Sequence, residues 1–190
     1  MRYAAEHNEQ TRERILEAAA RLFREHGIAA VGLATIMAEA GLTVGTFYTH
    51  FKSKEALVRE TLLRSLDARH EEVKQAVLAG TDIETVIRAY LSPAHRDAAG
   101  TGCTVAALAS EVARHPRATR NTFATHNALT LDALADYLSK RQGKPVRRAD
   151  AAALLGLLAG TLQLARAIPD RAESDAILEA GIRAALRLSA

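Results

Sequence analysis

A short stretch of the sequence gathers the side chains best suited to contact a nucleic acid. Five such side chains lie within residues 43–54, directly after a glycine turn: Thr43, Thr46, Tyr48, His50 and Lys54. Their hydroxyl, phenol, imidazole and ammonium groups can donate hydrogen bonds to phosphate oxygens or base edges. The chemistry that these residues support is recognition of a polyanion, not the making or breaking of bonds.

A helix over residues 44–50 would divide this stretch into two faces. Phe47 and Phe51 are four residues apart and share one face, which predicts that both rings are buried. Gly45 and Thr46 lie opposite them, with Val44 at the edge, so a small face remains for close approach to a major groove. The alternative interpretation is a helical subdomain with an aromatic core and no ligand.

Two of the predicted contacts lie at helix starts. Thr43 is placed either to cap the helix over residues 44–50 or to contact a phosphate, and both interpretations remain open. Lys54 begins a long helix whose free backbone amides can bind a phosphate. Ser53 is expected to cap that helix.

Catalytic and metal-binding patterns are missing from the sequence. The seven histidines are scattered, and none pairs at His-x-x-x-His spacing with a glutamate. The single cysteine, Cys103, cannot form an intramolecular disulfide or a multi-cysteine metal site. Neither a glycine-rich phosphate loop nor a nucleophile elbow is present. We therefore predict a protein that is not an enzyme, with no catalytic residue, metal or cofactor.

Composition predicts an all-α fold. Of the 190 residues, 48% are hydrophobic, which is enough for a sizeable core, and Gly and Pro are sparse. The net charge of +3 is compatible with a polyanionic partner but is weak evidence for one. The longest apolar run, residues 151–168, contains Gln163 and Arg166 and is read as a buried helix. With no signal-peptide pattern in the polar N-terminus, we expect a cytoplasmic protein that does not contact a membrane.

Periodicity and caps predict about nine helices, separated by turns at glycine and proline. A Thr81–Glu84 capping box and Ser174 are expected to start two of them. The stretch 93–102 is expected to be the least structured loop. The helices are predicted over residues 9–26, 33–40, 44–50, 54–79, 84–92, 103–114, 117–141, 147–167 and 174–188.

The first three predicted helices have the spacing of a helix-turn-helix, and Gly41 supplies the residue without a side chain that the turn needs. We therefore divide the chain into a three-helix DNA-binding module, residues 1–55, and a helical C-terminal domain, residues 56–190. The helix over residues 54–79 would join the two domains.

Two segments carry a specific resemblance to a known family. "TRERILEAAARLFREHG" followed by "IMAEAGLTVGTFYTHFKSKEAL" resembles the TetR family of bacterial transcriptional regulators over residues 11–57. The resemblance implies a homodimer that binds a double-stranded DNA operator, and a C-terminal domain that binds a small effector and then lowers the affinity for DNA. The matching positions that commonly touch DNA are Thr43, Val44, Gly45, Thr46, Tyr48, His50 and Lys54.

The second helix departs from the family pattern. It begins Val31-Gly32-Leu33-Ala34, without the usual cap and polar contact residue, and Thr35 is the substitute that we predict. Met37 stands where the family usually has alanine. These departures motivate the alternative that the DNA-binding face has decayed.

Small and apolar residues at helical spacing near the C-terminus predict a dimer interface. As the resemblance implies, two helices from each chain would form a four-helix contact, and an ordinary intrachain core is the alternative. The predicted interface residues are Leu155, Gly156, Leu158, Gly160, Leu162, Ile177, Leu178, Gly181, Ile182 and Ala185.

An effector pocket is expected among the helices between residues 54 and 167. Polar or aromatic residues with apolar neighbours are its candidates: Tyr90, Cys103, Phe123, His126, Asn127, Gln163 and Arg166. Each has a structural alternative, and no ligand is identified by them.

The sequence thus favours a ligand-responsive repressor that binds a palindromic operator. Two other functions stay open: a helical small-molecule-binding protein with degraded DNA binding, and a redox or electrophile sensor acting through Cys103. No basic residue closely flanks Cys103 to lower the pKa of its thiol.

Overall fold

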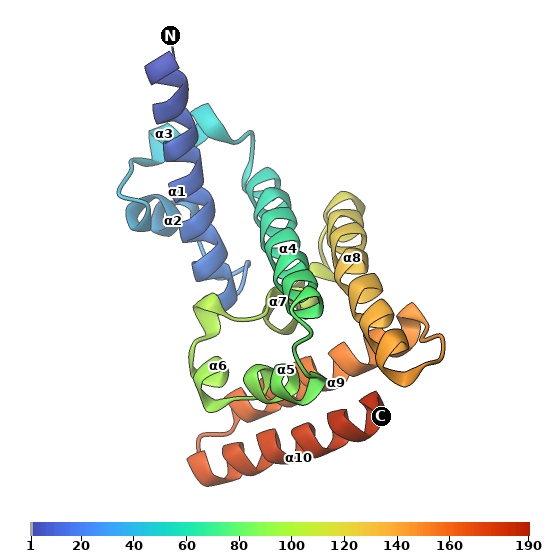
Figure 1. Cartoon of the computed structure of the whole chain (residues 1–190). Coiled ribbons are helices and arrows are strands. Elements are labelled where there is room, and N and C mark those ends of the chain that lie inside the picture. The colour runs from blue at the N-terminus through green and yellow to red at the C-terminus, as the bar shows by residue number, and fades with distance from the viewer. Residues whose placement is uncertain (1) are drawn as a thin grey trace.

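The chain is built from helices that form an upper module and a lower, larger layer, as seen in a computed structural model (Figure 1). The structure describes the backbone of residues 2–190 and the side chains of residues 7–190. Met1, the first residue of the predicted N-terminal domain, lies outside the described residues. The helices are α1 (Arg2–His26), α2 (Leu33–Glu39), α3 (Val44–His50), α4 (Lys54–Leu78), α5 (Ile83–Tyr90), α6 (Pro93–Asp97), the 3-10 turn η1 (Ala99–Thr101), α7 (Thr104–Val112), α8 (Arg117–Gln142), α9 (Arg148–Ala167) and α10 (Arg171–Ser189).

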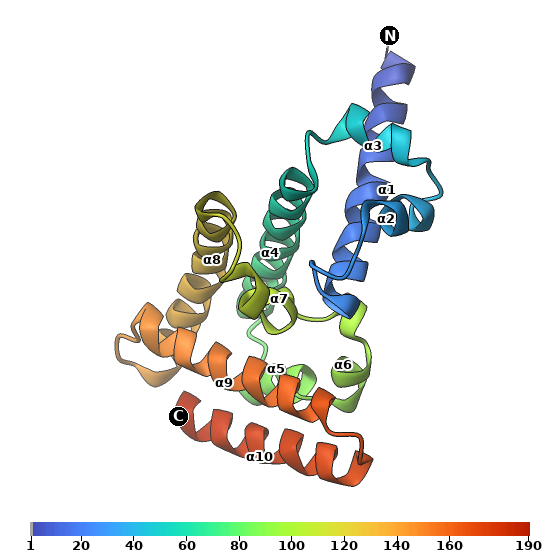
Figure 2. The same cartoon turned by 180° about the vertical axis from the view of Figure 1, so that it is seen from behind.

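The predicted all-α fold is confirmed, and within the described residues there is no strand. α1, α2 and α3 form the upper module, α4 leads down from it, and α9 and α10 lie side by side at the opposite end (Figures 1 and 2). Two hydrophobic clusters support this arrangement. One joins the upper module to α4 and α7, and the other joins α5 to α9 and α10.

The turn between α2 and α3 depends on a left-handed glycine. Gly41 has a φ of +67°, a conformation that costs any residue with a side chain. The amide of Leu42 donates to the carbonyl of Met37 across the turn, and Arg14 of α1 donates to the carbonyl of Ala40. The turn is thus fixed by its own backbone and by the neighbouring helix.

Several predicted helix starts are wrong. Asp82, not Thr81, caps α5, and Asp170, not Ser174, caps α10, so each helix begins where an aspartate can accept from a first-turn amide. Ser174 instead lies buried inside α10. Thr43 occupies the N-cap position of α3 but makes no capping hydrogen bond, whereas Ser53 caps α4 as predicted.

The stretch 93–102 is ordered rather than a loop. Ser92 caps the short helix α6, and Pro93 fits its first turn because that position needs no amide donor. Arg96 is buried and donates to Ser174 and Asp175 of α10. Sequence reasoning missed this helix because its stability comes from contacts with α10, which lies far away in sequence.

Candidate DNA-binding face and ligand cleft

The two phenylalanines of α3 are buried, as predicted. Phe47 is 0% exposed and Phe51 3% exposed, and their rings stack with centroids 5.6 Å apart. The guanidinium of Arg12 lies 4.3 Å from the centroid of the Phe51 ring and also donates to the carbonyl of His50. The C-terminal end of α3 is therefore held against α1, because these contacts leave it little room to move.

The opposite face of α3 is open to solvent. Val44 is 42% exposed and Tyr48 65% exposed. A Cβ added to Gly45 would meet only the hydroxyl of Thr43, at 3.8 Å, so packing does not require glycine there. The absence of a side chain instead lets the helix backbone approach another molecule closely.

The threonines of this face bond only to one another and to their own helix. The hydroxyls of Thr43 and Thr46 lie 3.1 Å apart, and Thr49 donates to the carbonyl of Thr46. Thr35 of α2 is exposed. These hydroxyls can turn to a ligand without breaking a buried hydrogen bond.

Lys54 is directed away from the predicted phosphate position. Its ammonium donates to the carbonyl of Ile28, with Nζ and O 2.6 Å apart. Lys52, which is not among the predicted contacts, is exposed and forms no ion pair within residues 7–190. The signal was present, since Lys52 adjoins the same turn.

His50 is half-buried at the end of α3. Burial and the neighbouring Arg12 lower the pKa of its imidazole below the usual value. The ring is therefore neutral at pH 7 and offers a hydrogen bond rather than a positive charge.

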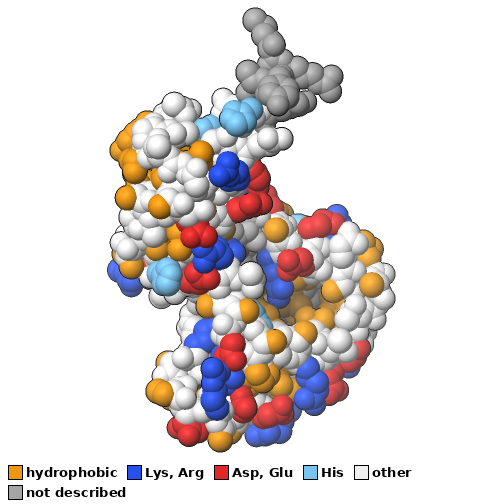
Figure 3. Space-filling model, turned by 90° about the vertical axis from the view of Figure 1, so that its left-hand side faces the viewer, with side chains coloured by type: hydrophobic (Ala, Val, Ile, Leu, Met, Phe, Trp, Pro, Cys, Tyr) orange, Lys and Arg blue, Asp and Glu red, His pale blue; other side chains and the backbone are white. Residues whose placement is uncertain are grey.

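Below the upper module the surface is hollowed into a cleft of about 810 Å³, with hydrophobic side chains in its floor (Figure 3). That volume is in the range of small-molecule sites. The cleft is lined by Glu13, Leu16, Glu17, Ala20, Arg21 and Arg24 of α1, by Thr61, Arg64, Ser65, Ala68, Arg69 and Glu72 of α4, by Thr85, Val86, Ala89 and Tyr90 of α5, and by Thr81, His95, Gly100, Thr101, Gly102, Cys103 and Thr104.

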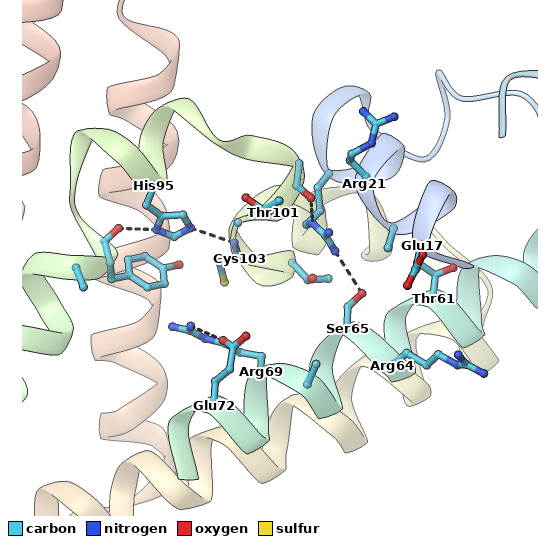
Figure 4. Close-up of a pocket in the computed structure, with 18 of the residues that line it drawn as sticks. Glu17, Arg21, Thr61, Arg64, Ser65, Arg69, Glu72, His95, Thr101 and Cys103 are labelled. Carbon is cyan, nitrogen blue, oxygen red and sulfur yellow. Dashed lines mark hydrogen bonds and ion pairs between the residues drawn. The ribbon is translucent and has the colours of Figure 1, made fainter. Parts of the chain in front are cut away.

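The cleft was expected among the later helices, but α1 forms one of its walls. Glu17 of α1 lies beside Thr61 of α4, and Ser65 and Arg69 continue the α4 wall (Figure 4). The sequence could not reveal this, because the seam arises only when α1 docks beside α4.

His95 fixes the end of the cleft nearest α7. Its Nε2 accepts from the amide of Cys103 at 3.1 Å, so Nδ1 carries the proton and donates to the carbonyl of Tyr90 at 2.6 Å (Figure 4). Burial lowers the pKa of His95, which keeps this neutral form. Cys103 is 6% exposed.

A narrower apolar recess adjoins the cleft. It has a volume of about 120 Å³ and lies among α4, α5, α8 and α9, where the sequence predicted a pocket. Five residues line both spaces: Arg69, Glu72, Thr81, Val86 and Tyr90. The rest of its wall is formed by Val73, Ala76, Val77, Ile83, Ile87, Thr130, Leu134, Tyr137, Leu154, Leu155 and Leu158.

Of the seven predicted effector residues, the structure brings Tyr90 and Cys103 into the cleft. Phe123 packs against the core of the upper module, and His126 lies 2.6 Å from a carboxylate oxygen of Asp67. Gln163 donates to the carbonyl of Ala106. Arg166 donates to the carbonyls of His95 and Arg96, and Asn127 is half-buried; none of these five lines the cleft or the recess.

The predicted dimer residues divide into two groups. Six are buried inside the single chain and support its own core: Leu158, Leu162, Leu178, Gly181, Ile182 and Ala185. Their burial favours the alternative of an intrachain core: a Cβ at Gly181 would overlap the side chain of Thr161, and the other five belong to the cluster that joins α5, α9 and α10. Leu155 lines the recess, and Ile177 is half-buried against the same core.

Gly156 and Gly160 face open space. With Leu164, which is 62% exposed, they share one face of α9 at four-residue spacing. Leu188 of α10 is 51% exposed. Gly156, Gly160 and Leu164 thus form a small apolar stripe on α9 that no described residue covers.

Within the described part of the chain, no group of three potential metal ligands comes together. None of its helices has the length and apolarity that a membrane span needs.

Comparison with known proteins agrees with this geometry. Residues 15–61 match the family model for bacterial regulatory proteins of the tetR family. The chain is 32% identical over 101 residues to the transcriptional repressor KstR2 of Rhodococcus jostii, covering 53% of this chain and 50% of that protein. It is 41% identical over 76 residues to the regulator TtgR of Pseudomonas putida, covering 40% and 36%.

These curated relatives are matched over half of their length or less. Among solved structures, reduced NemR of Escherichia coli superposes with a TM-score of 0.77 at 21% identity, covering 94% of this chain and 96% of that one. At this identity the likeness describes the fold. The relatives are transcriptional regulators rather than enzymes.

Proposed function

We propose that this chain, which belongs to the TetR family of bacterial regulatory proteins, is a repressor that binds a palindromic operator as a homodimer and is released by a small-molecule effector. The observation that carries the proposal is the exposed face of α3, backed by two buried phenylalanines. Such a face has the shape that a recognition helix needs in a major groove. Acting on DNA, the protein would work in the cytoplasm.

In the complex, Val44 and Thr46 contact base edges at the start of α3, where Gly45 allows close approach. Thr35, Thr43, Tyr48 and His50 contact phosphates or sugars around them. Lys52 supplies a positive charge, and Lys54 joins only if it leaves the carbonyl of Ile28.

A dimer would present two recognition helices about 34 Å apart, as a palindromic operator requires. The exposed stripe of Gly156, Gly160 and Leu164 on α9, together with the exposed Leu188 on α10, supports these two helices as the contact. Residues 1–55 would then bind DNA, and residues 56–190 would dimerise and bind most of the effector.

Release follows if the effector prefers a different spacing of the two modules. An effector between α4 and its neighbours shifts α4, whose first turn carries the DNA-binding module. The affinity for DNA falls only by the effector's preference between the two arrangements.

DNA binding is tested by selecting duplexes from a random pool and titrating the best one in a gel shift. Tyr48→Ala and Lys52→Ala should weaken binding, and Lys52→Ala should lower the log–log salt slope by about 1. Thr46→Ala should change the preferred sequence. Leu78→Ala removes an equally exposed side chain at the far end of α4 and should leave binding unchanged.

A pool that yields no enriched duplex would contradict the proposal and favour the small-molecule-binding alternative. The dimer is tested separately by light scattering. Leu164→Glu should yield monomers, whereas Leu78→Glu, at a side chain 71% exposed and outside the stripe, should not. A dimer unaffected by Leu164→Glu would remove α9 from the contact.

A further inference from the structure

Most charges of the cleft are paired, but two side chains of α1, Glu17 and Arg24, form no ion pair among residues 7–190. Arg64 pairs with Glu13, and Arg69 pairs with Glu72 at 3.1 Å. Arg24 lies within 4 Å of no carboxylate among residues 7–190, although it is half-buried. The cleft therefore holds a partly desolvated positive charge that lacks an anion.

The present partners of Arg24 are neutral. Its Nε donates to the carbonyl of Gly100 at 2.7 Å, and Nη1 lies 3.4 Å from the hydroxyl of Ser65 (Figure 4). Burial lowers the pKa of Arg24, which reflects the free-energy cost of holding this charge out of water. A guanidinium has five N–H donors in a planar fork that suits a carboxylate, so most of its donors remain available.

A second polar group in the cleft lacks a strong partner. The hydroxyl of Tyr90 is buried, has no strong hydrogen-bond partner and lies close to the weakly accepting thiol of Cys103; the residue is 5% exposed. Tyr90 lines both the cleft and the apolar recess, so an occupant that spans the two spaces would pass this residue. Burial and the neighbouring Cys103 raise the pKa of Tyr90, which keeps the hydroxyl protonated and able to donate.

The recess beyond Tyr90 suits an apolar group. Its volume of about 120 Å³ is bounded mostly by aliphatic side chains of α4, α5 and α9. Apolar cavities of this kind favour hydrocarbon over water, because water would find few hydrogen-bond partners there.

We propose that the effector is an amphipathic monocarboxylic acid, with its apolar end in the recess, a hydrogen bond from Tyr90, and its carboxylate on Arg24. This inference rests on the proposed function, since it names the class of molecule that releases the DNA. A single negative charge matches the one unpaired arginine. Glu13, Glu17 and Glu72 line the same cleft and disfavour a dianionic phosphate.

The position of Arg24 gives the carboxylate a direct contact with the DNA-binding module. Arg24 belongs to α1, while Ser65 belongs to α4 and Gly100 to η1. A carboxylate bound by the remaining donors of Arg24 draws the guanidinium toward itself and so competes with these contacts between elements. The effector thus acts on α1 itself as well as through α4.

The test titrates the purified full chain with octanoate and 3-phenylpropanoate in a calorimeter. 1-Octanol, n-octylammonium and octyl phosphate serve as neutral, cationic and dianionic probes of matched size. We expect binding of at least one carboxylate, and binding of the other three probes that is at least tenfold weaker. Equal binding of 1-octanol, or tighter binding of octyl phosphate, would overturn the carboxylate assignment.

Two variants locate the site. Arg24→Gln should weaken carboxylate binding about tenfold or more, as expected for loss of a charge-assisted hydrogen bond, and Tyr90→Phe about fivefold. Arg64→Gln is the matched control, because it removes the same charge from a cleft arginine that already has Glu13 as partner. Its affinity should remain within about twofold of wild type. Unchanged affinity in Arg24→Gln would reject the site.

DNA affinity is measured in the same samples with the selected duplex. Addition of the binding carboxylate should lower the affinity of wild type and not that of Arg24→Gln. Carboxylate binding without any DNA binding would reject the proposed repressor function and keep the binding site. DNA binding with no response to any carboxylate would reject the effector class and keep the repressor function.

Discussion

The upper module and the cleft both use helix α1, but they differ in how completely their polar and apolar groups are paired. In the module, Phe47 and Phe51 are buried and the turn at Gly41 is bonded to α1, so the local contacts are complete. In the cleft, Arg24 has only neutral partners and the Tyr90 hydroxyl has no strong one. The upper module is therefore preorganised to present the exposed face of α3. The cleft instead keeps polar groups with incomplete hydrogen bonding, which a bound molecule can complete.

The largest effect should come from the core of the module. Phe47→Ala removes a fully buried ring, and we expect it to lower the free energy of unfolding by about 3–5 kcal/mol. Tyr48→Ala, its neighbour on the exposed face, should change it by less than about 0.5 kcal/mol. Urea unfolding followed by circular dichroism at one fixed protein concentration measures both. Similar losses in the two variants would contradict the division of α3 into two faces.

The second-largest effect should be a difference in stability between alanine substitutions at the two glycines near the start of α3. Gly41→Ala forces a side chain into a left-handed backbone and should destabilise the chain by about 1–2 kcal/mol. Gly45→Ala lies in an open helical position and should stabilise it by about 0.5–1 kcal/mol. The same unfolding experiment applies, and we expect Gly45→Ala to weaken DNA binding despite its higher stability. If both variants lose stability, the exposed glycine has a packing role.

In the cleft, removing a polar group should increase stability. Tyr90→Phe deletes a buried hydroxyl that lacks a strong partner, so the ligand-free protein should gain about 1 kcal/mol. Tyr137→Phe is the control, since its hydroxyl donates to the carbonyl of Thr81 at 2.7 Å and its loss should destabilise. Thermal unfolding of ligand-free samples distinguishes the two signs. A loss of stability in Tyr90→Phe would mean that the cleft is as complete as the module.

The smallest effect should be on how stability depends on pH, through the contact of Glu55 on α4 with Thr119 on α8 and with His115 just before α8. Burial opposes ionisation of Glu55, but hydrogen bonds from Thr119 and His115 outweigh it and lower the pKa of this carboxyl. A depressed carboxyl pKa stabilises the fold above the unfolded value, near 4.5, and the contribution is lost as the pH falls through the folded value. Glu55→Gln should therefore flatten the acid side of a stability–pH curve.

Urea midpoints measured between about pH 7 and pH 3 give that curve, over the range where carboxylates titrate. Glu17→Gln removes an exposed carboxylate of the cleft and should leave the acid side as in wild type. An unchanged curve for Glu55→Gln would show that the contact between α4 and α8 does not depend on this carboxylate.

Sequence patterns predicted the module better than the rest of the chain, for physical reasons. Phe47, Phe51 and Gly41 obey local rules of spacing and backbone conformation, so their roles are readable without tertiary structure. Lys54 shows the limit even there. Its ammonium donates to the carbonyl of Ile28 in the segment between α1 and α2, a contact that spacing along one helix cannot reveal.

The cleft and the dimer residues depend on how distant helices dock. Arg24 reads as one more charge on an amphipathic helix until α1 lies against α4 and η1. Leu158 and Ile182 have the small-and-apolar spacing of an interface, but α9 and α10 use that spacing against each other. The same pattern serves contacts within a chain and between chains, so burial in the folded chain is needed to separate them.

Leu16 links the evolution of the cleft to that of the upper module. It lines the cleft and also belongs to the buried cluster that contains Phe47. Under the proposed function, a substitution selected because it admits a bulkier effector would also disturb the support of α3. We therefore expect effector range and DNA affinity to evolve together on α1 if the chain is such a regulator, and to evolve independently only through walls of the cleft outside α1.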